Sequence, residues 1–341
     1  MKTHKHLWSQ FISSENFNLA AHRALLGKKS KYSARRFLRN RDARLQRLRD
    51  ALERGTFKTG RYRVFTIYEP KQRDIYMLPL YPDHIVHHAL MNVLSPIWQK
   101  MFISDSFACI PGRGLHAASH RCTEFIRKNK YVLQCDIRKF YPSINHDIMM
   151  QIIKRKISDK RILELLENIV RSMPPPCGMP IGNLTSQWLG NLYMNDLDMF
   201  VKHGLHIKNY IRYCDDFCIF GDDATELVRL RAILTQWLRE NLGLTFSRAY
   251  IKPSSTGVNF IGYRHFRTHV ILTRAGARKL KRKMRQIIAH ADVSEHTQSQ
   301  LVSYSGWMQW ACCHNLRRKL CIQTANTTEP KFSRFFNKHI G

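Results

Sequence analysis

The sequence predicts an α+β fold in which basic helices lie near both ends and a β-rich segment lies between them. Apolar residues make up 44% of the 341 residues, which is typical of a globular protein. Short apolar runs in the middle alternate like strands, whereas segments near both ends show helical spacing and strong positive charge. A chain of this length can form one large domain or a few interlocked subdomains.

Positive charge dominates the composition. Lys and Arg number 56 against 25 acidic residues, which gives a net charge of +31. This balance favours nucleic acid as a partner, although a generally basic, solvated surface is the alternative. No run of about 18 uncharged apolar residues occurs, and the basic N-terminus lacks the apolar core of a secretory signal. We therefore expect a cytoplasmic protein that does not contact a membrane, with its nine cysteines reduced.

In the N-terminal third, the sequence predicts a basic helix followed by a hairpin. Residues 28–49 carry ten cations and one acid, with leucines at helical spacing up to position 52 and Gly55 as the stop signal. The basic face of this helix either binds phosphates or is merely solvated. Residues 61–78 alternate and contain many aromatic and β-branched residues, and Pro70 and Lys71 interrupt them, which predicts a β-hairpin.

The remaining elements follow from periodicity and cap residues. The sequence predicts helices over 83–94, 147–156, 185–201 and 225–242, a buried strand over 130–136, two strands over 210–220 and a strand pair around Gly262 in 257–265. Thr273 is a good N-cap for a second basic helix over 274–288, which holds seven cations and no acid.

Three acidic residues form the main candidate site. Asp215 and Asp216 lie in YCDD between two apolar strands, and Asp136 ends the strand KYVLQCD. Adjacent carboxylates at a hairpin turn repel each other unless a divalent cation is bound. Two magnesium ions about 3.5–4 Å apart could activate a hydroxyl and stabilise a leaving group. An exposed acidic turn is the alternative, and Asp222–Asp223 is more typical of a helix N-terminus.

The order of motifs from about residue 60 to residue 320 resembles the reverse transcriptase family. The matching segments are EPKQRDIY, FACIPGRG, QCDIRKFYPSI, GMPIGNLTSQ, YCDD and NFIGYRH. The resemblance implies an α+β right-hand polymerase with fingers, a palm whose antiparallel sheet carries the aspartates, and an α-helical thumb. It divides the chain into a basic helical N-terminal extension (1–60), fingers and palm (61–265) and a helical basic thumb (266–341).

The resemblance also implies a role for individual residues. Asp136, Asp215 and Asp216 would be catalytic and would hold two Mg²⁺ ions, with Mn²⁺ as a substitute, assisted by the Ile137 carbonyl. Tyr141 corresponds to the steric gate against a ribose 2′-hydroxyl. The implied nucleotide contacts are Lys71, Arg73, Ile137, Tyr141, Ile181 and Gly182. The implied template and primer contacts are Arg113, Ser186, Gln187, Gly262 and Tyr263.

Within the family, the chain is most similar to the reverse transcriptases of diversity-generating retroelements. The basis is Ser186–Gln187, Ile181 where many relatives carry Gln, and the segment SYSGWMQWACCHNL. This implies error-prone copying of a template-repeat RNA into adenine-mutagenised cDNA for retrohoming, encoded by a bacterium, archaeon or phage. The implied partners are template RNA, the RNA/cDNA duplex, dNTPs and an oligomer of a small basic accessory variability protein.

Departures and alternatives remain open at the level of the sequence. Cys214 stands where Ala or Met is commoner. The lysine that the resemblance implies as general acid for pyrophosphate has no obvious counterpart, and LGLTFSRAYIKP offers Arg248 or Lys252 as candidates. A retron, phage-defence or group II intron-like enzyme, an inactive RNA-binding protein of the same fold, and a template-independent transferase are the rival functions. A metal site at Cys312, Cys313, His314 and Cys321 is a weaker alternative because the spacing fits no usual ligand pattern. A site at His84 and His88, which are four residues apart, is weaker because no Glu or Cys motif lies nearby. Trp307 and Trp310 either stack on nucleic acid or belong to the core.

Overall fold

The computed structural model describes residues 3–68, 72–174, 176–328 and 330–340. The chain divides into two compact units. The first unit comprises Met1–Ile110, Cys135–Lys208 and Ala232–Arg248, and the second comprises Pro111–Gln134, Asn209–Arg231 and Ala249–Gly341. Each unit draws on three separate stretches of the chain. The three subdomains proposed above remain a prediction.

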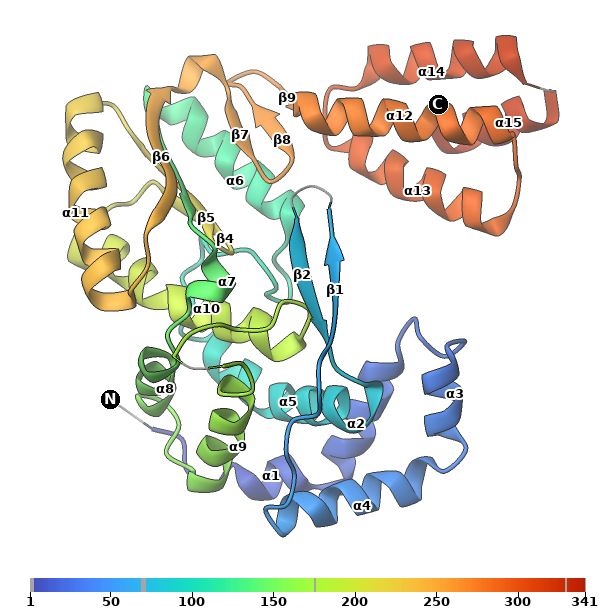
Figure 1. The fold of residues 1–341 in the computed structure, drawn as a ribbon. Helices are drawn as coiled ribbons and strands as arrows, with labels where there is room; N and C mark the ends of the chain where they lie inside the picture. Colours follow the sequence, from blue (N-terminus) through green and yellow to red (C-terminus); the bar gives the residue numbers. More distant parts are fainter. Residues whose placement is uncertain (1–2, 69–71, 175, 329, 341) are drawn as a thin grey trace. The chain divides into compact units, whose positions relative to one another are not determined.

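Helices make up the N-terminal part of the first unit. They are α1 (Trp8–Ile12), α2 (Ser14–Leu25), α3 (Tyr32–Leu38) and α4 (Arg41–Glu53), and, after the hairpin described below, α5 (Ile85–Gln99). A kinked turn (Leu80–His84), in which Tyr81 is extended, leads into α5. Helix α2 packs against α5 (Figure 1), where the Asn16 amide donates to the Phe11 and Ala89 carbonyls.

The sequence expectations for this helical part were right only in part. The single basic helix is wrong, because Asn40 leaves helical geometry at φ −134° and separates α3 from α4. The stop at Gly55 is confirmed: Gly55 has φ +67°, and Thr56 and Gly55 donate back to Ala51 and Leu52.

The predicted hairpin is confirmed in the first unit. Strands β1 (Arg63–Ile67) and β2 (Arg73–Met77) pair antiparallel, with Phe65 opposite Ile75. Residues 69–71, which include the expected break at Pro70–Lys71, lie outside the described residues. The other elements of this unit are α7 (Phe140–Ser143), α8 (His146–Lys154), α9 (Lys160–Val170), α10 (Leu184–Met199) and a π-helical turn (Phe200–Gly204). Helix α5 extends five residues beyond its expected end at residue 94 and contains Pro96.

A four-stranded sheet has the order β4–β5–β3–β6. Its strands are β3 (Tyr131–Ile137), β4 (Tyr210–Tyr213), β5 (Asp216–Gly221) and β6 (Phe246–Pro253). Within the second unit, Phe220 of β5 packs on Phe125 of helix α6 (Leu115–Lys128), with ring centroids 5.5 Å apart. Helix α11 (Ala224–Leu242) follows β5. The expected strand 130–136, the strand pair over 210–220 and the helix 225–242 are therefore confirmed, within a residue or two at each end.

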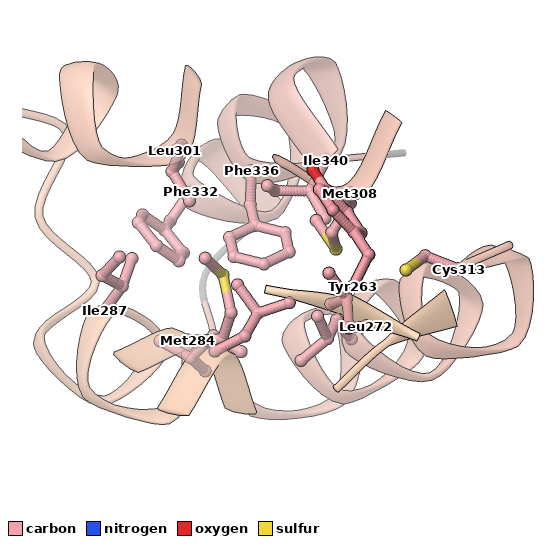
Figure 2. Packing of buried hydrophobic residues seen from close by; sticks show 13 residues of the cluster. Tyr263, Leu272, Met284, Ile287, Leu301, Met308, Cys313, Phe332, Phe336 and Ile340 are labelled. Carbon is pink, nitrogen blue, oxygen red and sulfur yellow. The ribbon is translucent and has the colours of Figure 1, made fainter. Parts of the chain in front are cut away.

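The C-terminal part of the second unit has its own hydrophobic core. Strands β7 (Val258–Phe260), β8 (Tyr263–His265) and β9 (Val270–Leu272) form an antiparallel sheet that follows a short 3-10 helix (Ser254–Thr256). Helices α12 (Arg274–His290), α13 (Glu295–Gln309), α14 (His314–Thr327) and α15 (Pro330–Ile340) complete it. Met284, Leu301, Phe332 and Phe336 meet in the centre of this core (Figure 2).

The cap and the apolar stripe of α12 were predicted correctly. The Thr273 hydroxyl accepts a hydrogen bond from the Gly276 amide at 3.2 Å, as an N-cap does. The buried stripe is Leu280, Met284, Ile287 and Ile288. The opposite face exposes cations, namely Arg274, Arg278, Lys279, Lys281, Arg282 and Arg285. Within the parts of the chain that the structure covers, no helix combines the length and apolarity needed to span a bilayer.

Candidate active site

The acidic pair lies at a two-residue turn in the second unit. Strands β4 and β5 pair antiparallel with Tyr213 opposite Asp216, so Cys214 and Asp215 are the turn residues. Cys214 has φ +60°, a left-handed conformation that costs a side chain about 1–3 kcal/mol and that glycine would adopt freely. The flanking Phe217 and Ile219 are fully buried, whereas Asp216 is exposed. Buried strands thus hold a strained turn that presents adjacent carboxylates.

A buried arginine supports this turn, and sequence reasoning missed it. Arg212 on β4 is fully buried, and its Nη1 donates to the Cys214 carbonyl at 2.9 Å. Burying a guanidinium is costly unless acceptors surround it, so a cation in the apolar strand YIRY was an available signal. Arg212 therefore fixes the backbone of the turn residue that precedes Asp215.

The third aspartate belongs to the first unit. Asp136 is half-buried near the end of β3, and its neighbours Cys135 and Ile137 are buried. The Ser247 hydroxyl on β6 donates to the Asp136 carboxylate, and it lies 3.3 Å from the Asp136 carbonyl. The Arg138 amide donates to the Thr245 carbonyl at 2.8 Å, which keeps the two strands in register. Sequence reasoning missed Ser247 because its partner is 111 residues away.

Because the resemblance implies a catalytic Asp136, we expect Ser247→Ala to lower kcat for nucleotide addition about five- to thirty-fold, with little change in KM. The lost hydrogen bond to a carboxylate is worth about 1–2 kcal/mol once exposure is considered, and about 1.4 kcal/mol is a tenfold rate change. Ser247→Thr, which keeps the hydroxyl, is the matched control and should recover most of the rate. Steady-state kinetics of the three proteins measure the effect. Equal rates for the Ala and Thr variants would mean that the Ser247 hydroxyl does not position Asp136.

The segment 178–182 connects Tyr141 to the hairpin β1–β2 within the first unit. The Met179 amide donates to the Tyr141 carbonyl, and the Tyr76 amide on β2 donates to the Ile181 carbonyl, both at 2.9 Å. Gly182 has φ +121°, and a Cβ there would lie 3.1 Å from Ile75 Cγ2 and 3.3 Å from the Tyr76 carbonyl oxygen. The structure therefore brings together Tyr141, Ile181, Gly182 and the strand that begins with exposed Arg73. Lys71 lies outside the described residues.

The remaining expected contacts differ in exposure. Gln187 and Gly262 are exposed and Arg113 is half-buried, whereas Ser186 and Ile137 are buried. Tyr263 is fully buried in the C-terminal core, and its hydroxyl donates to the Trp307 carbonyl at 3.0 Å. Burial raises the pKa of Tyr263 to about 12. The side chains of Ser186 and Tyr263 therefore face protein interior, and the template and primer contacts expected of this group remain predictions.

Neither the three aspartates nor the cysteine-rich segment 312–321 forms a ready-made cluster of three or more metal ligands in the described residues. Across the described parts of the chain, no group of three or more His, Cys, Asp or Glu side chains is arranged to hold a metal ion. The nine cysteines are present as thiols. Burial lowers the pKa of His87 to about 3 and that of His88 to about 4, as expected of packed neutral histidines.

The second acidic pair has a structural role. Asp223 accepts a hydrogen bond from the Thr225 amide at the start of α11, and Asp222 accepts one from the Lys130 amide, both at 2.8 Å. The interpretation as a helix N-terminal pair is therefore confirmed for Asp223, whereas Asp222 bonds to the segment before β3.

The structure shows where the two tryptophans and the two candidate general acids lie. Trp307 packs against the C-terminal core, and Trp310 stacks on His116 of α6 with ring centroids 4.1 Å apart. Burial lowers the pKa of Lys252, a direction that suits proton donation. Arg248 is exposed on β6.

Comparison with known proteins identifies the family. The family model "Reverse transcriptase (RNA-dependent DNA polymerase)" matches residues 71–265, which include the hairpin strand β2, all three aspartates and strand β8. The chain belongs to the reverse transcriptase family and carries an RNA-directed DNA polymerase domain with the α+β architecture of that family.

Individual relatives share about a quarter of their residues or fewer with this chain over the aligned segments. Protein YkfC of Escherichia coli (strain K12) is 26% identical over 277 residues, which cover 65% of this chain and 71% of YkfC. The group II intron-encoded protein LtrA of Lactococcus lactis subsp. cremoris is 22% identical over 170 residues, which cover 47% of this chain and 28% of LtrA. A structure of telomerase from Candida albicans with a telomeric RNA fragment aligns at 10% identity and a TM-score of 0.49, covering 84% of this chain and 62% of that one.

Proposed function

We propose that this protein copies an RNA template into DNA, with Asp136, Asp215 and Asp216 as the ligands of two divalent metal ions. The observation that carries the proposal is the strained turn that presents Asp215 and Asp216, inside the segment matched by the reverse transcriptase family. Asp136 lies near the end of β3, which neighbours β5 in the sheet order. The exposed cations of α12 and the net charge of +31 fit a polyanionic template.

The donor set fits a hard cation such as Mg²⁺. Magnesium takes oxygen ligands, usually one or two carboxylates together with substrate phosphates and water, rather than a cage made only of protein groups. Asp215 and Asp216 offer such oxygens at the turn between β4 and β5. Bound ions of this kind activate the attacking hydroxyl and neutralise the leaving pyrophosphate.

The residues of the first unit position the nucleotide in this proposal. Arg73 binds the triphosphate: it is exposed at the start of β2, the strand whose Tyr76 amide donates to the Ile181 carbonyl. Tyr141 excludes a ribose 2′-hydroxyl by contact with its ring. Its carbonyl accepts a hydrogen bond from the Met179 amide, which ties its backbone to the segment that contains Ile181.

Primer extension with Mg²⁺ and dNTPs on a defined RNA template tests the activity. A product whose sequence follows the template supports the proposal. Retention of RNA without a product would indicate an inactive RNA-binding protein of the same fold, and extension that ignores the template would indicate a terminal transferase.

The finer assignment is to the enzymes of diversity-generating retroelements, which copy a template-repeat RNA with errors opposite adenine and work with a small basic accessory protein. Ile181, Ser186–Gln187 and SYSGWMQWACCHNL support it. The alternative is a group II intron-like enzyme, supported by the similarity to LtrA. The DNA around the gene separates the two: paired repeats that differ at adenines beside a small basic reading frame favour the first.

Ile181→Gln is expected to lower the rate of misincorporation opposite adenine about fivefold or more. An apolar side chain cannot orient the nucleotide by hydrogen bonding, whereas one well-made polar contact is worth about 1–3 kcal/mol of discrimination. Ile181 is half-buried, and its carbonyl remains bonded to Tyr76 in the variant. Sequencing of cDNA from both proteins measures the rate, with Ile181→Leu as the apolar control. An unchanged adenine error rate in the Gln variant would discard the idea.

A further inference from the structure

We propose that Gly190 is a positioning residue for Tyr141, and that the absence of a side chain at position 190 sets how tightly the nucleotide's sugar is enclosed. The inference rests on the proposed function, because it takes Tyr141 as the residue that meets the sugar. It concerns one contact inside the first unit, between helix α10 and the short helix α7.

The rings of Phe140 and Tyr141 leave little room for a side chain at Gly190. A Cβ added at Gly190 would lie 3.2 Å from Phe140 Cε1, 3.3 Å from Tyr141 Cε1 and 3.5 Å from Tyr141 Oη. Carbon atoms in favourable contact are about 3.5–4.0 Å apart, so a methyl group would push both rings. Glycine is also the least favourable residue, apart from proline, inside a helix such as Leu184–Met199. The glycine is therefore explained by the space it leaves for the rings and not by the helix.

The rings of Phe140 and Tyr141 differ in how easily an added methyl group can displace them. Phe140 is buried, so protein surrounds it and resists its displacement. Tyr141 is half-buried, but its backbone is held because its carbonyl accepts from the Met179 amide at 2.9 Å and from the Ile144 amide at 3.4 Å. The Tyr141 ring can therefore move only by rotation of its side chain, toward its exposed side. In the proposed function that side faces the sugar.

The consequence is a tighter sugar site in Gly190→Ala. We expect the KM for dNTPs to rise three- to tenfold and kcat to change less than twofold. Incorporation of rNTPs should fall further, so the selectivity for dNTPs over rNTPs should increase. Gly306→Ala is the matched control, because Gly306 also lies inside a helix but has no atom within 4 Å of an added Cβ. This control should leave KM and selectivity unchanged.

Tyr141→Ala provides the decisive comparison. Removing the ring also gives Phe140 room, since the two ring centroids are 5.1 Å apart. In that background Gly190→Ala should leave the dNTP KM and the sugar selectivity within twofold. If Gly190→Ala instead raises KM equally with and without the Tyr141 ring, the methyl group acts elsewhere and the inference is overturned.

Thermal unfolding separates failure of this inference from failure of the proposed function, since it does not require activity. Gly190→Ala should lower the Tm in the natural background and raise it by about 2 °C in the Tyr141→Ala background, where only the helix preference of alanine remains. A wild-type chain without template-dependent activity would overturn the proposed function. Equal Tm shifts in both backgrounds would overturn the Gly190–Tyr141 coupling.

Discussion

Asp215→Asn is expected to lower the rate of RNA-templated extension at least about a thousandfold while leaving the fold intact. An amide keeps the shape of the side chain but removes the negative charge that a divalent ion needs. Metal stabilisation of the reacting oxygens is worth several kcal/mol, and each 1.4 kcal/mol is a factor of ten in rate. Because Asp215 is a turn residue between paired strands, the substitution leaves the register of β4 and β5 unchanged.

The chain contains its own control for this experiment. Asp222 belongs to a second Asp-Asp pair seven residues later, and it accepts a hydrogen bond from the Lys130 amide at 2.8 Å. The amide oxygen of Asp222→Asn can accept the same bond, so that variant should extend primers at close to the wild-type rate. Single-turnover extension at saturating Mg²⁺ measures all three proteins. If Asp215→Asn retains more than a tenth of the rate, the acidic turn does not hold the catalytic ions.

Features that depend on neighbouring residues were predictable from the sequence. The turn Cys214–Asp215 was predicted from two short apolar runs that meet at two acids. Helix α12 was predicted from the Thr273 cap and from an apolar residue at every third or fourth position. The family motifs added the candidate site because their order is linear in the chain. None of these features requires knowledge of which distant segment packs where.

Features that depend on distant partners were not predictable. Ser247 contacts Asp136 across 111 residues, and Gly190 leaves space for rings fifty positions earlier in the chain. Arg212 is buried although its charge suggests exposure, and its guanidinium donates a hydrogen bond to the Cys214 carbonyl. The break at Asn40 was missed for another reason: charge and leucine spacing continue across it, while the backbone leaves the helix.

Gly182→Ala is expected to lower kcat/KM for dNTPs about 30- to 1,000-fold. At φ +121° an L-residue is strained by about 1–3 kcal/mol. The added methyl group also meets Ile75 Cγ2 at 3.1 Å and the Tyr76 carbonyl oxygen at 3.3 Å, and overpacking of this kind costs about 1–3 kcal/mol. The Tyr76 amide is bonded to Ile181, so β2 cannot move away without breaking that bond. The strand that carries Arg73 would therefore shift relative to segment 178–182.

Two further variants separate backbone strain from steric contact in this prediction. Gly243→Ala also places alanine at a positive φ, +63°, but no atom lies within 4 Å of its Cβ, so it should change kcat/KM less than threefold. Ile75→Ala removes the Cγ2 atom that the new methyl group meets, and the double variant with Gly182→Ala should recover about tenfold if contact contributes as argued. A loss in Gly182→Ala that Ile75→Ala does not relieve would assign the whole effect to backbone strain. A wild-type kcat/KM in Gly182→Ala would instead mean that the connection between segment 178–182 and β2 does not position the nucleotide.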